Sequence, residues 1–246
     1  MERCRVSLSD MQTDDLTEPS FPPLLKGEEA APGQDPFDKA IAAASIGTDA
    51  GLVVWARRGD ALDAAMVLAP EQKLAEAIGV GFALSVGLGD AIGALAPPEV
   101  AVHYTWPGGI KINGADCGRF RAASSHADPS EVPDWLVFGI TLPYLPGEGA
   151  EGGAAPDQTS LIEEGCGDVT PLRLLESWSR HSLAWINTFI DQGMAPLHRV
   201  WTGRAWQMGE PLPDGAGMFM GLDEQGGMLV KSAHTTRLRP LPEWLK

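Results

Sequence analysis

Positively charged side chains surround a tryptophan-proline turn in the middle of the chain, and they are well suited to bind an anion. Lys111 is the only lysine between His103 and Arg121, and its flexible ammonium can reach a carboxylate or a phosphate. Arg119 and Arg121 are two positions apart, so in a strand they share one face while Phe120 points to the other. The pattern predicts a cationic strand face. The alternatives are a solvated turn lysine and arginines that pair with acidic groups on the surface.

The other reactive residues predict neither a metal site nor a nucleophile paired with a base. The five histidines are dispersed and form no His-x-x-x-His pattern. Cys4, Cys117 and Cys166 are far apart, with no Cys-x-x-Cys motif. Because free cysteine is among the most buried side chains, Cys117 is expected to be a small core residue. No metal ligands are therefore predicted.

The elements that must position these residues are strands interspersed with helices. Apolar and β-branched runs predict strands at residues 52–56, 64–68, 100–106, 116–122 and 135–142, with a hairpin turn at 111–114. Helical periodicity and capping signals predict helices at residues 35–47, 71–95 and 170–193, and a short one from Thr159. Short β segments follow at residues 217–230 and 235–241. This order predicts a sheet packed against helices, followed by a smaller β module.

Length and composition predict a soluble globular protein. The chain has 246 residues, 44% of them hydrophobic and 21% charged, which is ordinary for a folded domain with a small appendage. Its formal net charge of -15, from 18 basic and 33 acidic residues, argues against a nucleic-acid partner. The most apolar run, from Ile78 to Gly89, is too short to cross a bilayer, so no membrane association is predicted. Few cysteines and an acidic N-terminus without an apolar run favour a cytoplasmic location.

The stretch from His103 to Arg121 resembles a motif of the biotin and lipoate protein ligases. It contains Trp106-Pro107, a hairpin and then Gly118, as does the family's Lys-Trp-Pro-Asn-Asp segment with the Lys-Leu-Ala-Gly strand that follows. Gly108-Gly109 stand where the family has Asn-Asp, Thr105 replaces the leading basic residue, and Ala115 falls near the position of the biotin-side lysine. The motif is thus present in a divergent form.

The resemblance extends in the same order over nearly the whole chain after Phe21. It implies an α+β fold with a mixed, mainly antiparallel sheet and helices over residues 21–194, and a small C-terminal β-barrel over residues 195–246. Residues 1–20 are polar and acidic and are expected to form a disordered leader. Residues 146–157 have the composition of a surface loop.

The family joins biotin or lipoate to ATP as an acyl-adenylate and then passes the acyl group to a lysine of an acceptor domain. The resemblance therefore implies a carboxylic-acid cofactor, ATP with Mg²⁺, and a biotinyl or lipoyl acceptor domain as partner. It implies catalytic roles for Arg58 and Lys111. The residues implied to bind the cofactor are Arg57, Arg58, Gly59, Trp106, Gly108, Gly109, Lys111, Gly118 and Arg121.

Two alternatives remain because the arginine loop is reduced to Arg57-Arg58-Gly59 and the biotin-side lysine is missing. In the first, the protein is a noncatalytic relative that binds an acyl ligand. In the second, it is an ATP-independent acyltransferase of the same superfamily that uses Cys117 as its nucleophile. The relation of Cys117 to a cleft between Arg58 and Lys111 would discriminate among the three hypotheses.

Overall fold

The computed structural model describes residues 18–147, 157–233 and 235–245. The predicted leader, residues 1–20, and the predicted loop, residues 146–157, lie mostly outside the described residues, so they stay predictions.

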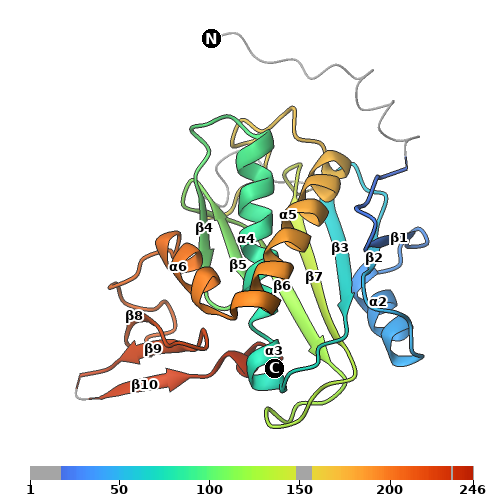
Figure 1. The fold of residues 1–246 in the computed structure, drawn as a ribbon. Helices are drawn as coiled ribbons and strands as arrows, with labels where there is room; N and C mark the ends of the chain where they lie inside the picture. Colours follow the sequence, from blue (N-terminus) through green and yellow to red (C-terminus); the bar gives the residue numbers. More distant parts are fainter. Residues whose placement is uncertain (1–17, 148–156, 234, 246) are drawn as a thin grey trace, which may run out of the picture.

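One large sheet forms the centre of the described chain, with strand order β1-β2-β3-β7-β6-β5-β4 (Figure 1). Only β1 and β2 pair in parallel, and every other neighbouring pair is antiparallel. The strands are β1 (Lys26–Glu29), β2 (Leu52–Trp55), β3 (Ala61–Leu68), β4 (Val102–Thr105), β5 (Gly109–Ile112), β6 (Ala115–Ser124) and β7 (Leu136–Pro143). The predicted mixed, mainly antiparallel sheet is confirmed.

Helices pack on both faces of this sheet. Helices α4 (Val80–Leu95) and α5 (Pro171–Gln192) lie on one face, and α2 (Pro36–Ser45) covers part of the other (Figure 1). The predicted single helix at 71–95 is two helices, α3 (Leu74–Ala77) and α4. The predicted short helix from Thr159 is wrong, because this segment makes turns. Its side chains bond locally instead, with the Thr159 hydroxyl donating to Glu164 at 2.6 Å, and such bonds compete with helix formation.

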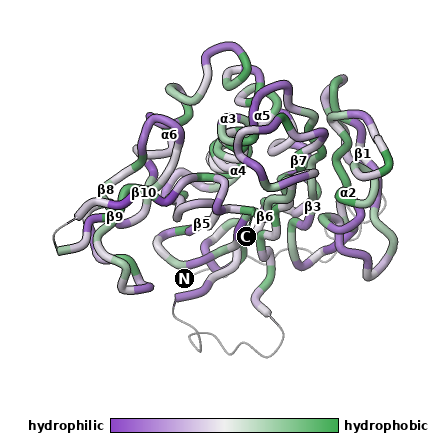
Figure 2. Tube along the Cα trace, turned by 90° about the horizontal axis from the view of Figure 1, so that it is seen from below, coloured by the Kyte–Doolittle hydropathy of each residue, from purple (hydrophilic) through white to green (hydrophobic). Residues whose placement is uncertain are grey.

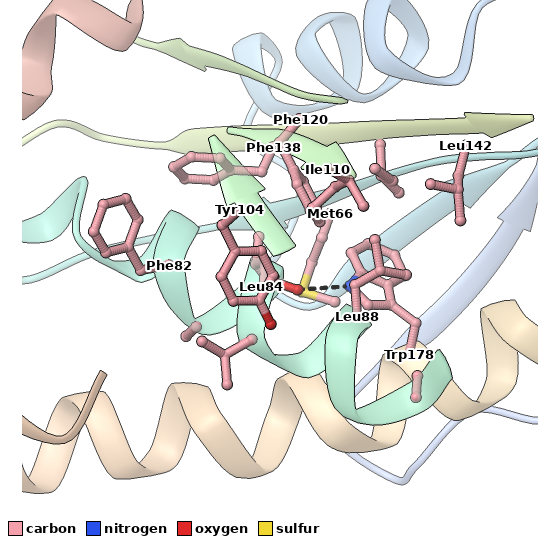
Figure 3. Packing of buried hydrophobic residues seen from close by; sticks show 14 of the residues in the cluster. Met66, Phe82, Leu84, Leu88, Tyr104, Ile110, Phe120, Phe138, Leu142 and Trp178 are labelled. Atoms are coloured by element: carbon pink, nitrogen blue, oxygen red, sulfur yellow. Dashed lines mark hydrogen bonds between the residues drawn. The ribbon is translucent and has the colours of Figure 1, made fainter. Parts of the chain in front are cut away.

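The main core lies between the sheet and α4 (Figure 3). Aromatic rings fill much of it, including those of Phe82, Tyr104, Phe138 and Trp178. The Trp178 indole N–H donates to the Leu84 carbonyl at 3.2 Å, which satisfies its polar atom within the core. Residues Leu74–Leu95 are apolar and long enough to cross a membrane, but 78% of the most apolar window is buried inside the fold. A helix that is apolar all round is expected at such a position in a core.

The C-terminal part differs from the barrel that was predicted. Helix α6 (Ala195–Gly203) comes first, and strands β8 (Met218–Leu222), β9 (Met228–Lys231) and β10 (Thr236–Arg239) form an antiparallel sheet of order β10-β9-β8. Three short strands are too few to close on themselves, and a barrel is not confirmed for the described residues. This sheet lies at the opposite end of the molecule from β1 and α2 (Figure 1, Figure 2). The final 3-10 helix η1 (Leu241–Leu245) packs Trp244 against Phe138 in the main core.

Candidate functional site

The face of the sheet that α2 leaves partly open carries polar side chains. On β3, Leu62 and Ala64 belong to the core beneath α4, whereas Ala65 belongs to the core beneath α2. Side chains alternate between the two faces of a strand, so Asp63 points to the same face as Ala65. At this position an apolar residue would extend the core beneath α2. Asp63 therefore stands on the same face as α2, beside the polar residues of β7 and β6.

Two adjoining hollows form a groove across this face. The first has a volume of about 680 Å³ and lies over β7, β6 and β5, and the second, of about 550 Å³, lies between β1, α2 and the end of β2. Both are lined by Asp35 and Asp63, so they adjoin at these two residues. We call them together the sheet groove. Its size is typical of sites for small molecules.

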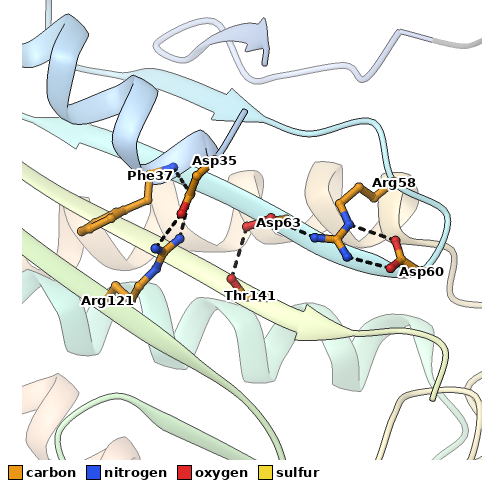
Figure 4. A network of polar contacts seen from close by, with 7 residues as sticks. All are labelled: Asp35, Phe37, Arg58, Asp60, Asp63, Arg121 and Thr141. Atoms are coloured by element: carbon orange, nitrogen blue, oxygen red, sulfur yellow. Dashed lines mark hydrogen bonds and ion pairs between the residues drawn. The ribbon is translucent and has the colours of Figure 1, made fainter. Parts of the chain in front are cut away.

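Arg121 and Asp35 form a bidentate ion pair (Figure 4), and both residues line the sheet groove. The guanidinium Nη1 and Nη2 donate to the Asp35 carboxylate at 2.8 and 2.9 Å. Asp35 also caps α2 by accepting from the Phe37 backbone N–H at 2.8 Å. The hydrogen bond from Arg121 is the main cause that lowers the pKa of Asp35 below its ordinary value. The charge of Arg121 is therefore already neutralised by a side chain that orders the helix start.

A second network joins Arg58, Asp60, Asp63 and Thr141 (Figure 4). Arg58 donates to both oxygens of Asp60, at 2.9 and 2.6 Å. Its contact with Asp63 is longer, at 3.4 Å. The Thr141 hydroxyl donates to Asp63 at 3.2 Å. The Asp63 side chain is only 12% exposed, and burial raises its pKa. Its carboxylate has thus lost much of its hydration without gaining a close cationic partner.

The other two arginines of the sheet groove differ in their partners. Arg57 pairs closely with Glu29, at 2.7 Å. Arg119 is exposed on β6, and its side chain makes no ion pair or hydrogen bond within the described chain. Arg119 is therefore the cation of the groove that is available to an anionic ligand.

Lys111 and Trp106 line a different cavity, of about 760 Å³, between the hairpin and the C-terminal part. The Lys111 ammonium pairs with Asp116 at 2.9 Å and lies 5.5 Å from the centre of the Trp206 ring. The Trp106 indole N–H donates to the Gly226 carbonyl at 2.9 Å. Asp116 lines both this cavity and the sheet groove. The structure therefore does not bring Lys111 into one hollow with Arg58.

The four glycines of the predicted site occupy three environments. Gly109 and Gly118 line the sheet groove, and Gly118 has φ +152°, with the Thr141 carbonyl where a Cβ would lie. Gly108 packs against Trp244, away from the groove. Gly59 lines a small hollow under α5. Of the predicted set, Arg57, Arg58, Gly109, Gly118 and Arg121 are thus brought together in the sheet groove.

Cys117 lines the sheet groove but is poorly suited to act as a nucleophile. The residue is only 1% exposed, and burial raises the pKa of its thiol to about 12. A nucleophilic cysteine needs a lowered pKa, which a nearby cation or helix N-terminus usually provides. Here Glu164 and Glu163 act in the opposite direction. The geometry does not favour the thiol transferase alternative.

The sequence patterns do not predict three residues of the groove, Asp35, Asp63 and Thr141. Asp63 is the only charged residue in the otherwise apolar run 61–68, and this is the signal by which the sequence could have indicated it as a site residue. The described residues contain no group of three or more His, Cys, Asp or Glu that could hold a metal ion.

The fold and the groove define an α+β domain with a hollow of small-molecule size, and comparison with known proteins identifies its family. The model of the biotin/lipoate A/B protein ligase family matches residues 21–203. The chain therefore belongs to this family. It is 26% identical over 185 residues to a biotin--[acetyl-CoA-carboxylase] ligase of Paracoccus denitrificans, covering 72% of this chain and 77% of that protein.

Solved structures show the same fold. A biotin protein ligase-like protein of unknown function from Silicibacter sp. has a TM-score of 0.87 and 50% identity, covering 93% of this chain and 100% of that chain. The biotin protein ligase of Aquifex aeolicus in complex with biotin and ATP has a TM-score of 0.66 and 15% identity, covering 88% and 94%. At this identity the Aquifex enzyme supports the fold alone.

Proposed function

We propose that this protein binds biotin or a related carboxylic acid in the sheet groove, and joins it through an acyl-adenylate to a lysine of an acceptor protein. The single observation that carries the proposal is that the two hollows of the groove adjoin at Asp35 and Asp63. One hollow is lined by Arg57 and Arg58 and the other by Gly109 and Gly118, and these residues lie in the two segments whose family counterparts enclose the adenylate.

In this proposal Arg119 binds the carboxylate of the acid. It is exposed at the groove and has no partner in the described chain, so binding an anion there breaks no existing ion pair. Hydrogen bonds that involve charged groups contribute about 1.5–3 kcal/mol. The membership of the ligase family, and relatives described as a biotin ligase and as a complex with biotin and ATP, support biotin as the acid and ATP as the co-substrate.

The triphosphate of ATP would lie along the groove, with its α-phosphate beside the carboxylate at Arg119 and its β- and γ-phosphates, which leave as pyrophosphate when the carboxylate attacks the α-phosphorus, at Arg57 and Arg58. Both arginines already pair with carboxylates, Glu29 and Asp60, so binding of a nucleotide requires these pairs to open or to be shared. Cations at this position would offset the phosphate charge as the adenylate forms. The turn between β2 and β3 is accordingly the segment expected to rearrange with ATP.

Two measurements test this function. Calorimetry should show biotin binding that Arg119→Ala weakens by roughly ten- to a hundredfold, whereas Arg180→Ala, at an exposed arginine of α5, should leave the affinity unchanged. Incubation with ATP, biotin and a biotinyl acceptor domain should then label the acceptor lysine. Binding without ATP-dependent labelling would reject the ligase step, and the absence of binding would reject the groove as the site.

A further inference from the structure

Transfer of the acyl group to a lysine requires a base, and the sheet groove offers carboxylates for this role. A lysine side chain is an ammonium near neutral pH, and it must lose a proton before its nitrogen can attack the acyl carbon. A histidine or a carboxylate most often accepts such a proton. No histidine lines the groove in the described chain. The base that the groove can supply is therefore a carboxylate.

Four carboxylates of the described chain line the groove, and three of them are held in close ion pairs. The distance from the carboxylate to its cation is 2.7 Å for Glu29, 2.8 Å for Asp35 and 2.9 Å for Asp116. The ion pair of Asp63 with Arg58 is longer, at 3.4 Å. Protonation of a closely paired carboxylate sacrifices its ion pair. Asp63 is therefore the carboxylate of the groove that can take a proton at the least cost.

The surroundings of Asp63 favour a proton on this side chain and fix its orientation. The side chain is 12% exposed, and burial raises the pKa of its carboxyl. The Thr141 hydroxyl donates to Oδ1 at 3.2 Å, and Nη1 of Arg58 contacts Oδ2 at 3.4 Å (Figure 4). The other charged groups that act on it are Asp35, before α2, and Arg121 on β6. An oriented carboxylate of raised basicity is suited to general base catalysis.

Strand register places Asp63 across the groove from the position proposed for the acid. Asp63 on β3 is opposite Thr141 on β7, and Thr141 is opposite Arg119 on β6. Because neighbouring strands are about 4.8 Å apart, Asp63 and Arg119 are separated by roughly 10 Å at their backbones. A nitrogen about 3 Å from the acyl carbon and about 3 Å from the Asp63 carboxylate spans roughly 6 Å. The row therefore has room for the acceptor amine once pyrophosphate has left.

We propose that Asp63 is the general base that activates the acceptor lysine. This inference rests on the proposed function, since it assigns a residue to the transfer from the acyl-adenylate. One proton passes from the lysine ammonium to the Asp63 carboxylate, and the freed lone pair of the nitrogen forms a C–N bond at the acyl carbon. The bond from the acyl carbon to the phosphate oxygen breaks, and AMP leaves with its electron pair. The nitrogen loses a second proton to solvent as the amide forms, and Asp63 then returns its own proton to solvent.

The test measures the two steps separately on the full chain. Biotin-dependent exchange of labelled pyrophosphate into ATP reports adenylate formation, and labelling of a biotinyl acceptor domain reports the transfer. Asp63→Asn should keep the exchange at no less than the wild-type rate, because the base acts only in the transfer, and should slow the labelling by roughly a hundredfold or more. Asp49→Asn, at an exposed position outside the groove, should match the wild type in both assays.

Hydroxylamine distinguishes a missing base from a damaged site. It is already an unprotonated amine near neutral pH, so it needs no base to capture the acyl group as a hydroxamate. The wild-type protein and Asp63→Asn should therefore form the hydroxamate at equal rates. Thr141→Val gives a second variant in case Asp63→Asn folds poorly, because it removes only the hydroxyl that orients the carboxylate. It should slow the labelling several-fold and leave exchange and hydroxamate formation unchanged.

Labelling at the wild-type rate by either folded variant would overturn the inference and leave the proposed function standing. Loss of hydroxamate formation to the same extent as labelling would do the same, because it would show that Asp63 is needed for more than removal of a proton. Absence of exchange by the wild-type protein would overturn the proposed function together with the inference.

Discussion

At the scale of single residues, the arginines of the groove are of two kinds. Three form ion pairs that support the fold, and the side chain of the fourth, Arg119, has no partner in the described chain. Arg121, Arg58 and Arg57 each hold a carboxylate of the same chain at 2.8 Å or less. Arg119 makes no such contact within the described residues. Truncating one of the paired arginines would therefore change structure as well as binding, whereas truncating Arg119 tests binding alone.

Cys117 provides a prediction at the same scale. Burial raises the pKa of the Cys117 thiol to about 12, so the thiol stays protonated at pH 8, whereas the thiolate is the reactive form. Iodoacetamide should therefore modify Cys117 in the folded protein far more slowly than in urea, as measured by peptide mass spectrometry. Native Cys117 that reacts as fast as the unfolded chain would restore the thiol transferase hypothesis.

At the scale of elements, Asp35 joins the start of α2 to β6. Asp35→Ala removes both the cap and the Arg121 pair, and loss of a cap alone costs about 1 kcal/mol. Because the pKa of Asp35 is lowered in the folded state, its ionic contribution is fully present above its ordinary pKa and is lost as the pH falls through the lowered value.

Urea unfolding measures this contribution. Asp35→Ala should lower the free energy of unfolding at pH 7 by about 1–2 kcal/mol, and the difference from wild type should shrink as the pH falls through the lowered pKa of Asp35. Asp35→Asn, which keeps an oxygen for the Phe37 N–H, should lose less at pH 7. A difference that does not change with pH would show that the ion pair contributes nothing.

Trp106 links the hairpin to the C-terminal sheet through its bond to the Gly226 carbonyl. Trp106→Phe should lower the free energy of unfolding by about 1 kcal/mol through this bond, in addition to the loss of buried area. Trp135→Phe is a matched control because its indole makes no hydrogen bond in the part of the chain described. Equal losses in the two variants would show that the Trp106 bond does not stabilise the C-terminal part.

At the scale of the whole molecule, the sequence predicts the sheet and its helices better than it predicts the site. Period-two and helical patterns are local, so β2, β7 and α5 could be located from them. Asp63, Thr141 and Arg119 lie opposite one another in the groove because β3, β7 and β6 pair in this register, and the three residues are far apart in the chain. Likewise, the ion pair between Lys111 and Asp116 forms because a register shift between Ile110 and Lys111 places the two residues opposite each other. No local sequence pattern indicates this shift.

The most direct test of the central claim is a crystal structure of the protein with bound biotin. The account predicts that biotin lies in the sheet groove, with its carboxylate within hydrogen-bonding distance of the Arg119 guanidinium. Biotin bound in the cavity beside Lys111 and Trp206, or bound in the groove without contacting Arg119, would contradict the account.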